Sequence, residues 1–219
     1  MTRQAGGDRA EPAGRADPAE RAEGGVVAGL LLAAGAGSRL GTPKALVEFR
    51  GERLVDRGVR LLADGGCDPV IVVLGAALVP VPGAEVVSNP DWATGMGSSL
   101  RAGLRALPGR AGAVVVALAD QPLVGPAAVR RLIGAFAAGA CVAAASYGGA
   151  PRNPVLIARE HVAEVAALAV GDVGARPFLR SRPDLVTLVP CDDVGDPVDV
   201  DTAEDLLSLQ RKGAGRPAS

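Results

Sequence analysis

Short segments of continuous apolar residues recur along the chain and alternate with segments that have helical spacing. The clearest apolar segments are 26–32, 70–74 and 113–118. They lack the polar–apolar alternation of a strand with one solvated face, so each is expected to be a strand buried on both faces. Helices on both sides of a sheet supply that cover. The sequence therefore predicts an α/β fold, a three-layer α/β/α sandwich with a mostly parallel sheet.

The remaining elements follow from the same patterns. Pro126 stands at the first turn of one expected helix, where its missing N–H costs no hydrogen bond. Thr202 and Asp205 have the spacing of a helix N-cap and its capping-box partner. We expect further strands at 84–87, 141–147, 154–157 and 186–189, and helices at 54–63, 96–107, 126–138, 161–168, 175–180 and 202–210.

The chain has 219 residues, which is the length of one domain with tails. Residues 1–24 are Ala, Gly, Pro and mixed charge without apolar periodicity, so we expect a disordered N-terminal tail. Residues 211–219 are expected to form a flexible C-terminal tail for the same reason. The folded domain is therefore placed at residues 25–210.

The composition argues against two classes of partner. The 23 Lys and Arg residues are balanced by 24 Asp and Glu residues, so no general attraction to nucleic acid or to an anionic membrane is expected. The apolar segments are also far shorter than the ~20 residues that cross a bilayer.

Cys67, Cys141 and Cys191 are far apart and form no CxxC pair, which is typical of reduced thiols. We expect a cytoplasmic protein that binds neither nucleic acid nor membrane.

The loop after the first strand, residues 33–44, carries the strongest functional signal. It combines Gly35 and Gly37 with two cations, Arg39 and Lys44. Glycine lets backbone N–H groups approach an anion closely, and Arg and Lys supply the charge that a polyphosphate needs. A tight turn with surface charges is the ordinary alternative for a glycine-rich loop. The position of this loop after a buried strand favours phosphate binding.

Two better-known phosphate loops do not match. A Walker A loop places Gly before its Lys, whereas Pro43 precedes Lys44 here. A dinucleotide-binding loop starts a helix inside its glycines and ends the second strand with an acidic residue that holds the ribose. Pro43 blocks such a helix, and the second strand runs into Leu74 and Gly75 without a carboxylate.

Carboxylates follow at two further places. Asp120 comes directly after the strand at 113–118, where open α/β sheets bind their ligands. A lone Asp in such a place is often a turn residue, but a phosphate loop nearby favours Mg²⁺, which binds one or two carboxylates together with substrate phosphates. Asp199 and Asp201 are two residues apart, so in extended backbone both point the same way. Either could ligate metal, although Asp201 could instead simply complement a helix dipole.

Five segments, taken in order, resemble the molybdenum-cofactor nucleotidyltransferases, and together they look like the cytidylyltransferase branch of that family. The first segment alone is similar only to the wider nucleotidyltransferase superfamily. Ala-Ala-Gly at 33–35 and Asp-Gln-Pro at 120–122 are the features that resemble the cytidylyl branch. The segments are 32–44, 89–101, 118–122, 171–176 and 199–205.

This resemblance implies a nucleotide-diphospho-sugar-transferase-like fold and a cytosolic enzyme. The implied reaction joins molybdopterin phosphate to a nucleoside triphosphate, most simply CTP, with Mg²⁺ as cofactor and pyrophosphate as product. A molybdenum hydroxylase is a candidate partner. The chain departs from the family pattern at Arg152 and Asn153, where Gly-His is expected before Pro154, and at Ala203, where Pro is usual. The first departure leaves the identity of the acceptor open.

The roles expected at the site follow from this reaction. Lys44 is expected beside the α-phosphate and Arg39 at the leaving phosphates, and Asp120 is expected to anchor Mg²⁺ together with Asp199 or Asp201. Base, ribose and phosphate contacts are expected from Leu32, Ala33, Ala34, Gly35, Ala36, Gly37, Asn89, Ser98 and Ser99.

Other features have plainer interpretations. His161, the only histidine, is expected to be a surface residue and not a catalytic base. The acceptor phosphate is already an anion, so the reaction needs no base. Trp92 could line the acceptor site or cover the core, and Arg176 could bind phosphate or stay solvated. The three cysteines are expected to be inert.

Several rival functions stay open. Transfer could use GTP, or another phosphorylated acceptor such as a sugar phosphate or a phosphorylated acid. A non-catalytic carrier that inserts the molybdenum cofactor is a rival of another class, although a carrier has no use for Arg39, Lys44 and Asp120 together. A dinucleotide-binding oxidoreductase is the third rival, weakened by Pro43 and by the missing carboxylate for the ribose after the second strand.

Overall fold

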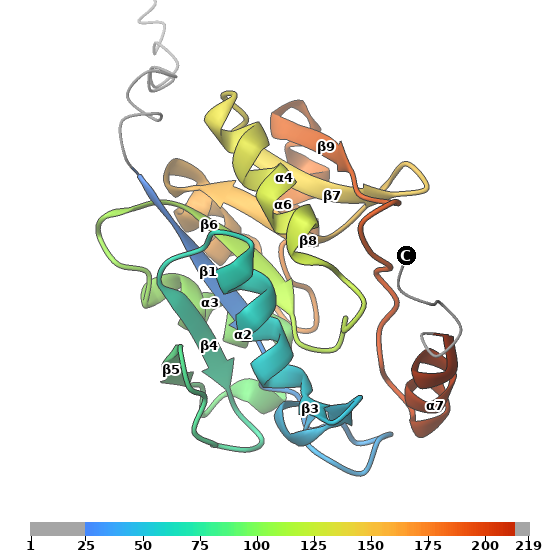
Figure 1. Cartoon of the computed structure of the whole chain (residues 1–219). Helices are drawn as coiled ribbons and strands as arrows, with labels where there is room; N and C mark the ends of the chain where they lie inside the picture. Colours follow the sequence, from blue (N-terminus) through green and yellow to red (C-terminus); the bar gives the residue numbers. More distant parts are fainter. Residues whose placement is uncertain (1–24, 213–219) are drawn as a thin grey trace, which may run out of the picture.

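The computed structural model describes residues 25–212, and its core is one seven-stranded sheet (Figure 1). The strand order is β5-β4-β1-β6-β8-β7-β9. The strands are β1 Val26–Leu32, β4 Val70–Leu74, β5 Glu85–Ser88, β6 Ala111–Leu118, β7 Val142–Tyr147, β8 Ala150–Ala158 and β9 Val186–Pro190.

The sheet is mostly parallel, as the sequence predicts. The pairs β1–β4, β1–β6, β4–β5 and β7–β9 are parallel, whereas β8 runs antiparallel to both β6 and β7. The reversal at β8 arises because β7 and β8 form a hairpin through Gly148 and Gly149, which both have positive φ. β8 therefore begins at Ala150 rather than at the expected residue 154.

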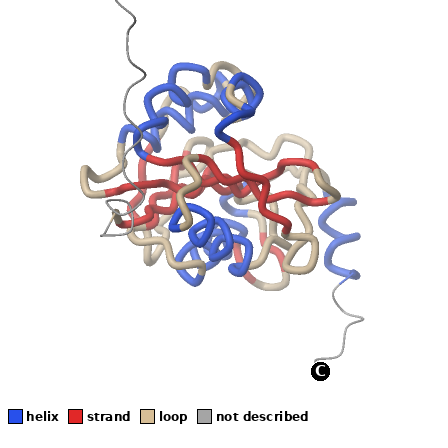
Figure 2. The backbone as a smooth tube through the Cα atoms, turned by 90° about the horizontal axis from the view of Figure 1, so that it is seen from above, coloured by secondary structure: helices blue, strands red, loops and turns tan. Residues whose placement is uncertain are grey.

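Helices cover both faces of the sheet, which Figure 2 shows nearly edge-on between two helical layers. Successive residues Leu30 and Leu31 of β1 are fully buried in two different cores, one on each side. Helices α2 and α4 contribute to one core, and α3, α5 and α6 contribute to the other. The helices are α2 Leu54–Asp64, α3 Met96–Arg105, α4 Pro126–Ala137, α5 Val162–Leu168, α6 Arg176–Ser181 and α7 Ala203–Lys212.

The capping box predicted for the last helix is confirmed. The Asp205 backbone N–H donates to Thr202 Oγ1 at 3.1 Å, and the Thr202 N–H donates to Asp205 Oδ2 at 2.8 Å. Helix α7 continues to Lys212, past the expected end of the domain at residue 210. The tail expected at 1–24, and residues 213–219 of the tail expected at the other end, lie outside the described residues.

Short elements were not predicted. The hairpin of β2 Glu48–Phe49 and β3 Glu52–Arg53 has strands too short to show a period. Single helical turns lie at η1 Lys44–Leu46, η2 Trp92–Thr94, η3 Arg159–His161 and η4 Pro183–Leu185. Within residues 25–212, none of the helices combines the length and apolarity needed to cross a bilayer.

The topology brings two loops together at one edge of the sheet. β1 and β6 are parallel neighbours in register, with Leu32 opposite Leu118 at their carboxyl ends. The glycine-rich loop and Asp120 follow these two residues directly. Their proximity is therefore a consequence of strand order.

Candidate active site

The glycine-rich loop folds back on itself after β1. The Lys44 N–H donates to the Gly35 carbonyl at 3.0 Å, which closes the loop and starts the turn η1. Gly37 has φ +57°, and a Cβ there would lie 2.0 Å from the Thr42 carbonyl oxygen. No other residue fits this position without moving the loop. The fold of the loop thus depends on Gly37 and delivers Lys44 to the strand edge.

Lys44 connects the two strand-end loops to the acidic segment before α7. Its ammonium group donates to Asp120 Oδ2, and to Asp201 Oδ1 at 2.8 Å. Burial alone would lower the pKa of Lys44, but the charges and hydrogen bonds of Asp120 and Asp201 raise it above its usual value. Lys44 therefore stays cationic at neutral pH.

Asp120 is the buried carboxylate of the site, with 9% of its surface exposed. The Val200 N–H donates to its backbone carbonyl at 2.8 Å, which fixes the acidic segment beside the end of β6. Asp120 Oδ2 accepts from Lys44, whereas Asp120 Oδ1 is buried and has no hydrogen-bond partner among the described residues. A buried, unpartnered carboxylate oxygen is a suitable ligand for a cation.

Two further carboxylates lie near Asp120. Asp199 Oδ1 accepts from the Gln121 side-chain amide at 2.9 Å. The partial burial of Asp199 in the cavity wall, together with the negative charges of Asp120 and Asp201, raises the pKa of Asp199. Close carboxylates that repel one another in this way are an arrangement that a divalent cation stabilises.

Two cavities meet at Lys44 and Asp120. The smaller, of about 280 Å³, is lined by the start of the glycine-rich loop, by Trp92 and by Ser99. The larger, of about 580 Å³, is lined by the three carboxylates and by Arg152 and Arg176. Residues that line both are Leu32, Lys44, Met96, Leu118, Asp120 and Asp172.

Residues 29–192 match the MobA-like NTP transferase domain. The chain belongs to the MobA-like NTP transferase family. Together with the site, this membership makes the chain an enzyme of the nucleotidyltransferase type.

Two similar proteins match different shares of this chain. It is 40% identical to nicotine blue oxidoreductase of Paenarthrobacter nicotinovorans over 197 residues, which are 84% of this chain and 96% of that protein. It is 34% identical over 102 residues to a probable molybdenum cofactor guanylyltransferase of Opitutus terrae, covering 45% of this chain and 50% of that protein.

A solved relative confirms the fold. Rv0371c of Mycobacterium tuberculosis has a TM-score of 0.75 and 30% identity, and the match covers 85% of this chain and 98% of that chain. A second crystal structure of Rv0371c, with a TM-score of 0.72, is a complex with manganese.

Some of the residues predicted to contact the nucleotide in this MobA-like transferase line a cavity, and others do not. Leu32, Ala33, Ala34, Gly35 and Ser99 line the smaller cavity. Ala36 and Gly37 lie farther along the loop and line neither of the two cavities.

Asn89 and Ser98 are buried behind the smaller cavity and line neither cavity. Asn89 Nδ2 donates to Ser98 Oγ at 2.9 Å and to Ser99 Oγ at 3.0 Å, and its Oδ1 accepts from the Asp91 N–H. In this arrangement the two residues hold the loop before α3, so they support the cavity wall from behind.

Arg39 also lies away from the cavities. It is exposed, on the turn that follows Gly37, and it lines neither of the two cavities. Hydrogen bonds from Thr202, and more weakly the charge of Arg39, lower the pKa of Asp205. The role expected for Arg39 at the leaving phosphates stays a prediction, because Arg39 lines neither cavity.

Asp172 lines the site, although the sequence analysis gave it no role beyond its place in the segment 171–176. It lines both cavities, because the segment 171–172 packs against the loop before α3. The Gly97 N–H donates to the Gly171 carbonyl at 2.8 Å, and a Cβ on Gly95 would lie 2.7 Å from Asp172 Oδ1. The glycines at 95 and 97 are the sequence feature that permits this close approach.

The structure also shows where four residues with plainer interpretations lie. Trp92 lines the smaller cavity and also packs against one core. Arg176 is exposed at the start of α6 and lines the larger cavity. Cys67 and Cys191 are buried, and burial raises the pKa of the Cys67 thiol to about 12, which makes it unreactive.

Proposed function

We propose that this enzyme transfers CMP from CTP to the phosphate of a molybdopterin-type acceptor and releases pyrophosphate. The observation that carries the proposal is the junction of two cavities at Lys44 and Asp120. One cavity begins at the glycine-rich loop, which suits a nucleotide. The other is open to two arginines, which suits an anionic acceptor.

The reaction needs positioning more than covalent help from the protein. An oxygen of the acceptor phosphate attacks the α-phosphorus in line, and the bond to the pyrophosphate leaving group breaks. The acceptor is already an anion, so no general base is required. Lys44, at the junction, would stabilise the negative charge that grows on the α-phosphate, and it stays cationic because its pKa is raised.

A divalent cation suits the carboxylates of the site. Asp120 would hold it through the buried Oδ1, with Asp199 or Asp201 as a further ligand. When bound, such an ion neutralises phosphate charge. The manganese in the Rv0371c complex supports a divalent ion in this family, and we propose Mg²⁺ for this chain.

The choice of CTP rests on Ala-Ala-Gly at 33–35 and Asp-Gln-Pro at 120–122, the features that resemble the cytidylyl branch. The Opitutus terrae relative is a probable guanylyltransferase, so GTP is the nearest alternative. The choice of base depends on a few hydrogen bonds. A single buried donor or acceptor that the wrong base leaves unpaired is enough to reject that base.

The experiment is a panel of the four nucleoside triphosphates with Mg²⁺ and molybdopterin, with pyrophosphate as the measured product. We expect the fastest release with CTP. Faster release with GTP would change the nucleotide but keep the reaction. The absence of release with every triphosphate, from protein shown to be folded, would refute the transferase proposal.

A second candidate is favoured by the match to nicotine blue oxidoreductase, which spans 96% of that protein. In this alternative the smaller cavity would hold a nicotinamide dinucleotide that gives a hydride to a planar substrate in the larger one. Against it, no acidic residue follows β4 to hold a ribose, and the turn η1 replaces the helix of a dinucleotide-binding loop. Binding of NADPH but of no triphosphate would reverse the ranking.

The cellular setting follows from the proposed reaction. We propose a cytoplasmic enzyme whose product is passed to a molybdenum hydroxylase. The buried cysteines Cys67 and Cys191 form no disulfide in the described structure, which is compatible with a reducing compartment.

A further inference from the structure

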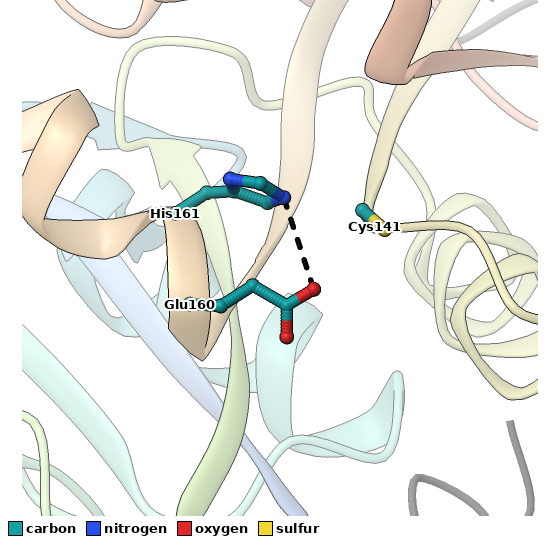
Figure 3. A group of neighbouring side chains, drawn as sticks. All are labelled: Cys141, Glu160 and His161. Atoms are coloured by element: carbon teal, nitrogen blue, oxygen red, sulfur yellow. Dashed lines mark ion pairs between the residues drawn. The ribbon is translucent and has the colours of Figure 1, made fainter. Parts of the chain in front are cut away.

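We propose that this chain has a second metal site, separate from the catalytic carboxylates, in which Cys141, Glu160 and His161 bind Zn²⁺. Figure 3 shows the Glu160 carboxylate facing the His161 imidazole, with the Cys141 side chain next to them. Each residue offers one potential ligand atom: the Cys141 sulfur, a Glu160 carboxylate oxygen and a His161 imidazole nitrogen. These three atoms lie within 4.8 Å of one another.

The spacing is close to that of a tetrahedral site. Zn²⁺ binds His nitrogen and carboxylate oxygen at about 2.0–2.2 Å and Cys sulfur at about 2.3 Å, which places ligand atoms roughly 3.4–3.7 Å apart. His161 Nε2 and Glu160 Oε1 are already 3.8 Å apart. To complete the geometry, side-chain rotations would bring ligand atoms that lie within 4.8 Å of one another to this spacing.

The backbone around the three residues is held by hydrogen bonds. The Ala158 N–H donates to the Cys141 carbonyl at 2.8 Å, which fixes the start of β7 beside the end of β8. Glu160 and His161 lie on the single turn η3 that follows β8. The imidazole of His161 packs 5.9 Å from the ring of Phe178, which is fully buried. This framework reduces the ordering that metal binding would otherwise require.

The donor set selects the kind of metal. A thiolate and an imidazole favour Zn²⁺ and similar transition ions, whereas Mg²⁺ prefers oxygen ligands alone. Three protein ligands leave one position for water. The site therefore would not compete for the Mg²⁺ proposed at Asp120.

The location separates this cluster from the active site. Ala158 pairs with Ala113 near the start of β6, whereas Asp120 follows the other end of that strand. The cluster therefore lies at the opposite edge of the sheet. A metal there would connect the chain before β7 to the turn between β8 and α5, which is a stabilising role and not a catalytic one.

The test uses the full chain, freed of metal by a chelator and then titrated with Zn²⁺ or Co²⁺. We expect one Co²⁺ per chain bound through a thiolate, seen as a charge-transfer band, together with a shift of the ring NMR signals of the sole histidine and a higher Tm with Zn²⁺. Loss of even an outer-sphere partner typically costs 10–100-fold in affinity. Cys141→Ser and His161→Gln should therefore each weaken Zn²⁺ binding by at least about tenfold.

Matched controls make the result specific. Glu160→Gln should weaken binding, whereas Glu164→Gln on α5, where Glu164 pairs with Arg182, should not. Cys141→Ser retains Cys67 and Cys191, so a band that persists in it would come from another thiol and would overturn the proposal. Asp120→Asn should leave Zn²⁺ binding intact. Absence of tight binding in the unmodified chain, or its loss only in Asp120→Asn, would show that this cluster is merely a Glu–His ion pair beside a thiol.

Discussion

Lys44 and Asp120 are 76 positions apart in the sequence, yet the ammonium of one donates directly to the carboxylate of the other. The contact joins the loop after β1 to the loop after β6, at the point where two cavities share a wall. A cation and an acid so placed can act on the same triphosphate, one on its charge and the other through a metal.

Loss of either partner should reduce turnover strongly. A charge-assisted hydrogen bond contributes roughly 1.5–3 kcal/mol, and each ~1.4 kcal/mol is tenfold in rate. We expect Lys44→Ala and Asp120→Ala each to lower kcat by about a hundredfold while the protein stays folded, as measured by pyrophosphate release and thermal melting. Asp184→Ala is the matched control, because Asp184 is exposed and pairs with Arg182. Near-normal turnover in either site variant would contradict the assignment.

The two glycines of the first loop should respond differently to alanine. At Gly37 a Cβ would meet the Thr42 carbonyl at 2.0 Å, whereas at Gly41, with φ +71°, it would meet nothing within 4 Å. Gly41→Ala should cost only the left-handed strain of about 1–2 kcal/mol. Gly37→Ala should also displace the loop and Lys44, and so reduce kcat several-fold more than Gly41→Ala does. Equal kinetics in the two variants would show that this loop does not position Lys44.

Substitutions in the larger cavity should change the KM for the acceptor and not the KM for CTP. Arg152 and Arg176 line it but do not line the smaller cavity. Removal of one such cation should raise the KM for the acceptor by about tenfold, equivalent to ~1.4 kcal/mol, and leave the KM for CTP unchanged. Steady-state kinetics with each substrate varied in turn separate the two. A rise in the KM for CTP alone would exchange the roles of the cavities.

Acid should weaken the attachment of α7. The pKa of Asp205 is lowered by its hydrogen bonds from Thr202, so its contribution to stability is present above the ordinary pKa of the carboxyl, near 3.8, and is lost as pH falls below it. Asp205→Asn should therefore be less stable than the unmodified chain at pH 7, with a difference that narrows toward pH 3. Thermal melting across that range measures it, and a constant difference would argue that Asp205 does not titrate in this way.

Much of this fold is predictable because strands that are buried on both faces have continuous apolar sequences. Strands β1 and β4 have their expected bounds, and the capping box of Thr202 and Asp205 is visible from spacing alone. The order of strands fixes the meeting of Lys44 and Asp120, since both follow neighbouring parallel strands.

The less predictable features depend on packing between distant segments. Asp172 reaches both cavities only because Gly95 and Gly97 allow close approach of another loop. Asn89 and Ser98 look like ligand contacts by residue type, but their amide and hydroxyl groups bond to each other. His161, expected simply at the surface, is mostly covered, with 15% of its side chain exposed. A single sequence does not reveal such pairings.

Calorimetric titration of CTP, with and without Mg²⁺, tests most directly whether the two strand ends bind a metal-chelated triphosphate together. Binding to the unmodified chain should strengthen markedly when Mg²⁺ is present, and Asp120→Asn should abolish that dependence while leaving residual affinity at the glycine-rich loop. CTP affinity that is the same with and without a divalent cation, or a dependence that survives in Asp120→Asn, would contradict the account.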